Sequence, residues 1–300
     1  MYTFKLTDES RKAIESLILD VKPFVNGMYD KKTFDNAITL SDKLPSELLN
    51  KIEAFLHLKE PYLWLENLPQ INQDVAFVAI INLVGGIYSY INEGTMININ
   101  RPKPHDESTN VSTFYSWNLF EYHTEKSFAT VPPDFLALYC IQNVPGAATL
   151  ASDINTAVST LDKNSVDILS QPLYKIKIPE VSGCSREYAP IKPILFKDEK
   201  GNYTAEVRFD NIICYSDEAK EALEQFRIAL NKVGFEIELK PGQMVIINNK
   251  LLAHGRKAFT PTFNATSDRE LHRVFIARDV AKLGKAFDPN TRKYNDYFEG

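Results

Sequence analysis

The hydrophobic pattern of this chain changes once, near residue 94, and that change limits the folds open to it. Before this point apolar residues recur at the three- and four-residue spacing of amphipathic helices; after it, short runs of aromatic and β-branched residues alternate with turn signals. Helices followed by many strands, with one further helix inserted, indicate a β-barrel or sandwich that helices buttress. We therefore expect a mainly β fold with helices.

Three helices are predicted in residues 1–93. The first has apolar residues at helical spacing and Asp8 or Ser10 at its start, and the second follows Pro45-Ser46. The third, Val75–Val84, is apolar nearly all round, which is typical of a helix buried on most sides. No Pro/Gly/Ser-rich linker follows, so these helices are expected to form a supporting layer rather than a separate domain.

The strands are expected in the remaining residues, where aromatic and branched side chains dominate. The predicted strands are Leu119–Phe128, Phe135–Ile141, Ile191–Phe196, Tyr203–Phe209, Phe235–Leu239, Gln243–Asn248 and Arg273–Ala277. One helix interrupts them, beginning at Ser216-Asp217-Glu218 and carrying an apolar stripe as far as Val233.

Bulk composition excludes several classes of protein. With 44% apolar residues the chain can bury a sizeable core, and its net charge of −5 argues against a nucleic-acid-binding surface. No apolar run reaches membrane-spanning length and the N-terminus lacks a secretory signal. Three scattered cysteines without CxxC spacing suit a reducing compartment, so a cytoplasmic protein is expected.

A candidate metal site lies in His123-Thr124-Glu125 together with the distant His254. Residues two apart on an extended strand face the same side, so His123 and Glu125 can reach one ion. Two imidazoles and one carboxylate form the ligand set of a mononuclear non-haem iron site, which leaves one face of Fe(II) open. Of the five histidines, only these two have apolar strand-like sequence on both sides. A half-exposed strand with a polar face is the alternative for the tripeptide alone.

Two arginines follow the second histidine. Arg269 and Arg273 share a parity, so both can face the interior of a barrel, while His272 between them points to the opposite face. A guanidinium pairs bidentately with a carboxylate, as a bound 2-oxo acid would require. Surface salt bridges with Asp268 or Glu270 are the alternative.

The motifs resemble those of a known family. Tyr122 to Phe128, Pro133 to Leu138, Gly146 to Thr149, Pro241 to Asn249, Leu252 to Arg256 and Ser267 to Arg273 follow the order of the clavaminate-synthase-like oxygenases. This group belongs to the taurine-dioxygenase-like Fe(II)/2-oxoglutarate superfamily and includes hydroxylases of free lysine, arginine and asparagine. The resemblance covers about residues 85–280 and implies a double-stranded β-helix, or jelly roll.

The resemblance also implies a division of the chain and a set of roles. A single domain over residues 1–300 is expected, with a helical support layer (1–93), a jelly-roll core with lid and inserted helix (94–280) and a C-terminal tail (281–300). His123, Glu125 and His254 are implied as the catalytic iron ligands. Thr149 and Arg269 would bind 2-oxoglutarate, and Arg273 the substrate's α-carboxylate. A carboxylate at position 125 favours hydroxylation over halogenation.

Further substrate contacts are expected from two acids. Glu121 lies two residues before His123 and could hold the substrate's ammonium group, with an exposed strand glutamate as the alternative. Asp210, in Val207-Arg208-Phe209-Asp210, would favour a cationic substrate tail, with a turn residue as the alternative. The expected lid, Ser182–Pro190, contains Arg186, Glu187 and Tyr188.

Together these features predict an Fe(II)- and 2-oxoglutarate-dependent dioxygenase. It would use O2 to hydroxylate an unactivated C–H of a free L-amino acid, lysine or arginine foremost, releasing succinate and CO2. A related oxygenase acting on a carrier-bound aminoacyl group, a peptide or a sulfonate is one alternative, and a non-catalytic metal-binding β-barrel is another. A small-molecule substrate is the expected partner, without nucleic acid or membrane, and the oligomeric state stays open, a homo-oligomer included.

Overall fold

The larger of two facing sheets is the main structural element of the fold. The computed structural model describes every residue except 1, 105–114, 180–185, 265 and 297–300. In this part of the chain a 9-stranded sheet has the order β1-β2-β13-β6-β15-β3-β17-β16, with β4 also paired to β15. Its strands are β1 Thr3–Lys5, β2 Tyr62–Glu66, β3 Gly86–Tyr90, β4 Asn98–Asn100, β6 Phe135–Gln142, β13 Met244–Asn248, β15 Glu270–Ala277, β16 Phe287–Asp288 and β17 Lys293–Tyr294.

The smaller sheet contains four antiparallel strands in the order β12-β7-β14-β5. They are β5 Phe120–His123, β7 Thr149–Asp153, β12 Phe235–Ile237 and β14 Leu252–Arg256. One apolar cluster contains Leu136 and Leu138 of the larger sheet together with Ala151 and Leu252 of the smaller one. The two sheets therefore pack face to face, and the predicted helix-buttressed jelly-roll fold is confirmed.

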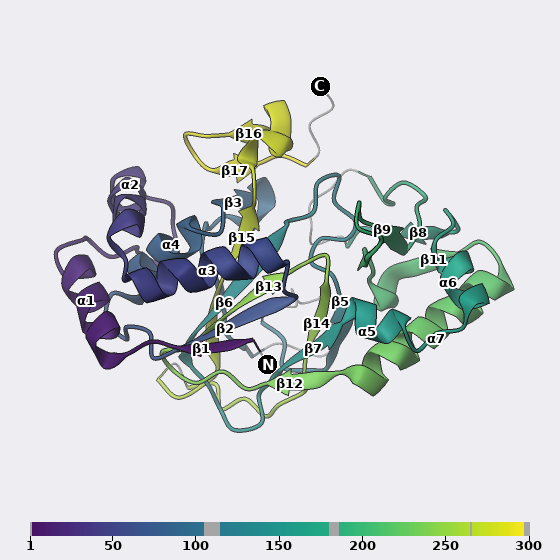
Figure 1. Ribbon diagram of the computed structural model, residues 1–300, viewed down its shortest axis with the longest axis horizontal. Helices are drawn as coiled ribbons and strands as arrows, with labels where there is room; N and C mark the ends of the chain where they lie inside the picture. Colours follow the sequence, from purple (N-terminus) through teal and green to yellow (C-terminus); the bar gives the residue numbers. More distant parts are fainter. Residues whose placement is uncertain (1, 105–114, 180–185, 265, 297–300) are drawn as a thin grey trace.

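Helices cover the outer face of the larger sheet (Figure 1). They are α1 Asp8–Ile18, α2 Lys31–Thr39, α3 Ser46–Leu58 and α4 Gln73–Asn82, with the short 3-10 helices η1 Ser41–Lys43 and η2 Ile91–Glu93. Alternate residues of β6 serve the two cores: Ala137 and Tyr139 pack with the helices, whereas Leu136 and Leu138 pack between the sheets. As predicted, α4 is buried nearly all round, because Val75–Ile81 all lie in the core.

A second group of helices packs beside the smaller sheet (Figure 1). It comprises α5 Ile154–Val158, α6 Lys163–Leu169 and α7 Asp217–Val233, with the paired strands β8 Tyr174–Ile176 and β11 Ile212–Cys214, β9 Leu195–Lys197 and β10 Tyr203–Ala205, and the 3-10 helix η4 Phe209–Asn211. The inserted helix α7 begins as predicted, because the Ser216 side chain accepts a hydrogen bond from the backbone N–H of Ala219.

Several local expectations are corrected. Thr7, rather than Asp8 or Ser10, caps α1. The N-terminal layer is not purely helical, since β1, β2 and β3 join the larger sheet, and the C-terminal tail adds η5 Val280–Ala286, β16 and β17. The strand predicted over Leu119–Phe128 ends at His123. Part of the expected lid lies outside the described residues.

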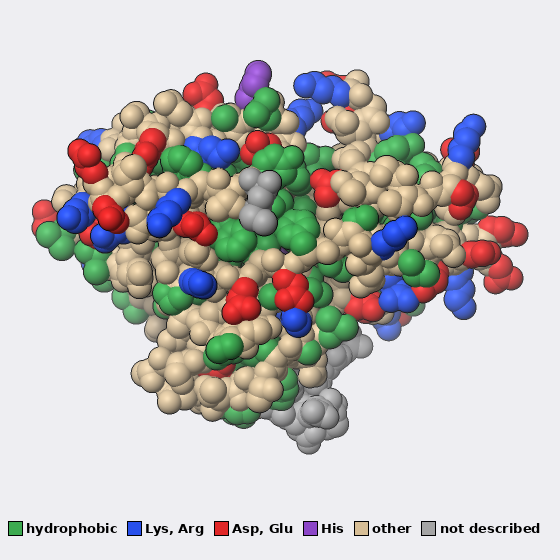
Figure 2. Space-filling model, turned by 60° about the horizontal axis from the view of Figure 1, so that its bottom comes forward, with side chains coloured by type: hydrophobic (Ala, Val, Ile, Leu, Met, Phe, Trp, Pro, Cys, Tyr) green, Lys and Arg blue, Asp and Glu red, His purple; other side chains and the backbone are tan. Residues whose placement is uncertain are grey.

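The molecular surface is mixed in charge. Lys and Arg side chains lie interspersed with Asp and Glu over the face drawn in Figure 2, in keeping with the net charge of −5. None of the helices in the described part of the chain has both the length and the apolar character that a membrane crossing requires.

Candidate metal centre

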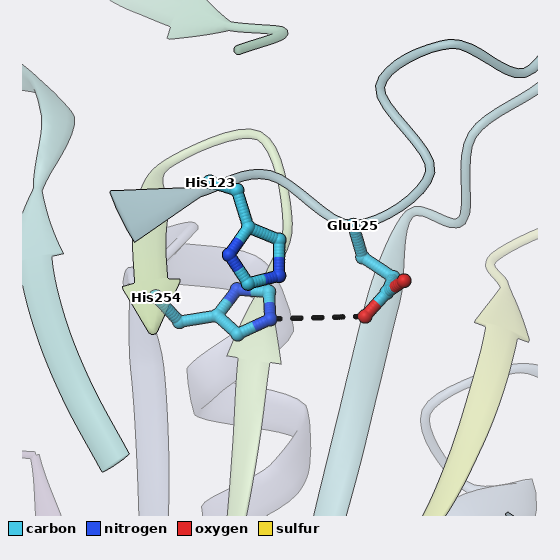
Figure 3. Close-up of side chains that lie close together, drawn as sticks. All are labelled: His123, Glu125 and His254. Carbon is cyan, nitrogen blue, oxygen red and sulfur yellow. Dashed lines mark ion pairs between the residues drawn. The ribbon is translucent and has the colours of Figure 1, made fainter. Parts of the chain in front are cut away.

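The two histidines of the predicted triad lie side by side on neighbouring strands of the smaller sheet. His123 is the last residue of β5 and pairs in register with His254 of β14. Their ring centroids lie 4.3 Å apart. Glu125 follows on the turn after β5, and its carboxylate points back toward both imidazoles (Figure 3).

One ligand atom from each of His123, Glu125 and His254 lies within 4.8 Å of the other two. Nε2 of His254 is 3.8 Å from Oε2 of Glu125. All three residues are buried. A pair of imidazoles with one carboxylate is the donor set of non-haem Fe(II) sites, so the residues present fit this metal.

The environment favours the metal-binding protonation states of His123 and Glu125. Burial, followed by the nearby His254, lowers the pKa of His123 well below its ordinary value. Burial alone would raise the pKa of Glu125, but the Arg273 guanidinium and then His254 hold that pKa well below its usual range. Nδ1 of His123 lies 2.9 Å from the Glu121 carbonyl oxygen and can donate to it, which leaves Nε2 for a metal.

A pocket opens beside the triad. It is lined by Asn100, Phe120, His123, Glu125, Leu136, Leu138, Thr149, His254, Gly255, Arg256, Arg269, Leu271 and Arg273. Thr149 and Arg269, the two residues expected to bind 2-oxoglutarate, are therefore brought together with the metal ligands. Their role in binding stays a prediction.

Arg269 is a buried cation without an acidic partner. Its side chain takes part in none of the ion pairs between described residues, and its Nε has no hydrogen-bond partner there. Burial lowers its pKa to about 10. A buried guanidinium of this kind needs a matching anion. The alternative of a surface salt bridge with Asp268 is wrong, because the Asp268 carboxylate instead accepts backbone N–H bonds, including that of Arg269 itself.

Arg273 differs from Arg269 in the partners of its guanidinium. It also faces the pocket, but Nη1 donates to Oε2 of Glu125 at 3.0 Å, and Nη2 to Oε2 of Glu93 at 3.2 Å and Oδ1 of Asn98 at 2.9 Å. Arg273 therefore has two acidic neighbours, Glu125 and Glu93. The opposite orientation of His272 is confirmed, since its ring contacts Asp74 of α4.

The two acids expected to contact the substrate lie outside the pocket lining. Glu121 is exposed and its carboxylate lies 3.7 Å from the Arg227 guanidinium of α7. A β-bulge explains this: His254 pairs with His123 but Arg256 pairs with Phe120, so β5 carries an extra residue and the alternation breaks. Asp210 lies on η4, half exposed, and accepts two hydrogen bonds from Arg208. The expected positions of both acids are thus corrected.

Three residues that contribute to the site were not predicted from the sequence. Glu93 contacts Arg273, Asn249 bonds the backbone of Glu125, and Arg256 lines the pocket with its pKa lowered to about 9 by burial and then by Arg269. Asn249 and Arg256 lie in the motifs Pro241 to Asn249 and Leu252 to Arg256, so their place in these motifs could have marked them as site residues. Glu93 carried none, because it lies in the helical support layer.

Comparison with known proteins gives a consistent answer. A model of the taurine catabolism dioxygenase TauD, TfdA family matches residues 28–275. Enduracididine beta-hydroxylase of Streptomyces hygroscopicus is 28% identical over 247 residues, covering 72% of this chain and 70% of the relative. L-lysine 3-hydroxylase of Catenulispora acidiphila is 27% identical over 270 residues, covering 80% and 74%.

The fold has solved counterparts. Asparagine oxygenase in complex with Fe(II), 2S,3S-3-hydroxyasparagine and succinate matches with a TM-score of 0.88 at 20% identity, over 98% of this chain and 99% of that one. The family match spans most of the chain, and the structure brings together the three residues that the resemblance implied as iron ligands. The expectation of an iron- and 2-oxoglutarate-dependent oxygenase is confirmed. The chain therefore belongs to the TauD, TfdA family of taurine catabolism dioxygenases.

Proposed function

We propose that this enzyme hydroxylates an unactivated C–H of a free L-amino acid and that a basic amino acid, lysine or arginine, is its preferred substrate. The observation that carries the proposal is a set of complementary charges beside the metal triad. Arg273 is buried against Glu125, and Glu93 lies next to it with its carboxylate 3.2 Å from the guanidinium. A cation and an anion this close together match the carboxylate and ammonium groups of an amino acid.

A second site for an anion supports the use of 2-oxoglutarate. Arg269 is buried without an acidic partner in the part of the chain that the structure describes, and Thr149 lines the same pocket. We assign them the distal carboxylate of 2-oxoglutarate, which a guanidinium and a hydroxyl can bind by charge-assisted hydrogen bonds. Bound Fe(II) would supply the activation of O2, so that one oxygen atom enters the substrate C–H while 2-oxoglutarate loses CO2 and takes up the other to become succinate.

The chain's own residues orient the reactants and exclude water. His123, Glu125 and His254 would hold the metal on one side of the pocket. Leu136, Leu138 and Leu271 form an apolar wall of the pocket. Such a wall strengthens the charge pairing of the arginines with bound anions, because few waters compete there.

Two observations support the preference for a basic side chain. The similar proteins include one named for lysine and one named for enduracididine. Asp210 is a half-exposed carboxylate that, within the described part of the chain, pairs with Arg208, two residues away. Exchange of Arg208 for a substrate cation would let Asp210 select lysine or arginine.

The test is a substrate screen. Purified enzyme with Fe(II), ascorbate and 2-oxoglutarate is incubated with each proteinogenic amino acid in turn, and succinate and the hydroxylated product are quantified. Lysine or arginine should stimulate succinate formation most and give a product heavier by one oxygen atom. Stimulation by a neutral amino acid alone would overturn the basic preference, and no stimulation by any would overturn the free-amino-acid proposal. His123→Ala serves as the inactive control.

A further inference from the structure

The orientation of the ligand Glu125 is not explained by the strand that precedes it. β5 ends at His123, and Glu125 lies in the following turn. Thr124 is bonded to Val207 through its backbone N–H and its hydroxyl. Lys126, on the other side, has a φ of 53°, in the left-handed region that non-glycine residues rarely adopt. A separate contact must therefore hold the backbone of Glu125 in place.

Asn249 makes that contact. Its Oδ1 accepts the backbone N–H of Glu125 at 2.7 Å, and its Nδ2 donates to the carbonyl oxygens of Glu125 at 3.0 Å and Pro133 at 2.9 Å. Its own backbone N–H donates to the carbonyl oxygen of Asp134 at 3.0 Å. The residue is 3% exposed. One side-chain amide thus bonds both backbone polar groups of a metal ligand.

The position of Asn249 links the two ligand-bearing segments. It lies on the turn between β13 and β14, and β14 carries His254. Glu125 lies on the turn after β5, which carries His123. Pairing of β5 with β14 fixes the two histidines relative to each other, but it leaves Glu125 outside the ladder.

We propose that Asn249 is a positioning residue of the metal centre, which acts through the backbone of Glu125 to aim its carboxylate at the two histidines. Without the amide, the buried N–H of Glu125 and the carbonyl groups of Glu125 and Pro133 lose their partner. A buried polar group without a hydrogen-bond partner is costly, so the turn is expected to rearrange until those groups find other partners. The carboxylate then leaves the geometry that the metal requires.

The inference rests on the metal site alone and does not depend on which amino acid is the substrate. Ni2+ is a suitable probe, because divalent metal affinities generally place it above Fe2+ and it resists oxidation under assay conditions. Asn248 offers a matched control. It is the preceding residue and the last of β13, and among the described residues its side chain accepts a bond only from the nearby backbone N–H of Lys250.

The first experiment measures Ni2+ binding by calorimetry to the wild type, Asn249→Ala and Asn248→Ala, with melting temperatures to verify folding. Asn249→Ala should bind about 10- to 100-fold more weakly, the range found for partners that orient metal ligands, and Asn248→Ala should bind like the wild type. Asn249→Ser, which retains a small polar group, takes the place of Asn249→Ala if that variant does not fold. Equal affinity of the Asn249 and Asn248 variants would overturn the inference.

The second experiment separates positioning from general structural damage. In a Glu125→Ala background the two histidines still bind Ni2+, so the effect of Asn249→Ala can be measured again. The loss of affinity should shrink to within about twofold, because the ligand through which Asn249 acts is gone. An undiminished loss in that background would contradict the proposal. Failure of the wild type to bind Ni2+ would instead refute the metal site itself.

Discussion

Arg273 donates a hydrogen bond to the same carboxylate oxygen of Glu125 that faces His254. The Nη1 to Oε2 distance is 3.0 Å, and Oε2 lies 3.8 Å from Nε2 of His254. The guanidinium therefore offsets the negative charge of Glu125 at the oxygen atom beside His254. We expect the proposed binding of a metal at Glu125 and of a substrate carboxylate at Arg273 to be coupled through this oxygen atom.

Loss of this arginine should destabilise the metal-free enzyme. Arg273→Gln leaves the buried carboxylates of Glu93 and Glu125 with less compensation, which should lower the free energy of unfolding by about 3 kcal/mol. Ni2+ should restore part of that loss by offsetting Glu125. Urea unfolding with and without Ni2+ measures both effects.

The exposed Arg227 is the control for that measurement. Arg227→Gln breaks ion pairs with Glu224 and Glu121 at the surface, which should cost about 1 kcal/mol or less. Equal destabilisation by the two variants would show that the ion pair of Arg273 with Glu125 contributes no more to stability than a surface ion pair.

Arg269 is expected to behave in the opposite way. Because Arg269 has no acidic partner among the described residues, Arg269→Gln should leave the unliganded enzyme at least as stable as the wild type. The same change should raise the KM for 2-oxoglutarate by about 100-fold, since a bound carboxylate loses its charge partner. Initial rates of succinate formation give the KM, and urea unfolding gives the stability. Arg278→Gln, at an exposed arginine, is the control variant. An unchanged KM in Arg269→Gln would contradict the proposed binding of 2-oxoglutarate by Arg269.

The clustering of His123, Glu125 and His254 could be predicted because these residue types are characteristic metal ligands. Histidines are few in this chain, and only His123 and His254 have apolar strand-like sequence on both sides. Strand parity predicted that Arg269 and Arg273 face the same side, and both line the pocket, although Arg269 precedes β15 and the pairing of β15 with β6 shifts register between Glu270 and Leu271. The apolar stripe and serine cap of α7 likewise depend on local sequence alone.

The predictions that were wrong concern features set by strand pairing between distant segments of the chain. Parity placed Glu121 beside His123, but the bulge in β5 turned it outward. Gly255 stands opposite that bulge, where a Cβ atom would lie 2.4 Å from the carbonyl oxygen of Phe120. The strands β1, β2 and β3 were missed because each is short and gains its ladder from partners far away in sequence. Neither kind of information is present in a local window.

His272 provides a test of that parity argument. Its Nδ1 lies 2.5 Å from Oδ1 of Asp74 and its Nε2 lies 2.8 Å from Oε1 of Glu270, on the side away from the pocket. His272→Leu leaves two carboxylates with fewer partners and should cost about 3 kcal/mol of stability. Ni2+ affinity should stay within about twofold of the wild type, because no metal ligand is touched. Calorimetry and urea unfolding check the two halves, and a large loss of Ni2+ affinity would place His272 in the metal site.

The buried His123 predicts the response of the metal-free enzyme to acid. Burial, and then His254, hold its pKa well below the ordinary value of 6.5, so the folded form keeps this imidazole neutral while the unfolded chain takes up a proton. Because the unfolded state binds more protons, stability should fall as the pH drops below about 6.5 and continue to fall until the depressed folded-state pKa is reached. One such group contributes a slope of up to about 1.4 kcal/mol per pH unit. Urea unfolding of the wild type and His123→Gln from about pH 7 to about pH 5 should show a shallower slope for the variant. His57→Gln, on the exposed face of α3, should keep the wild-type slope, and a wild-type slope in His123→Gln would mean that His123 is protonated in the folded protein.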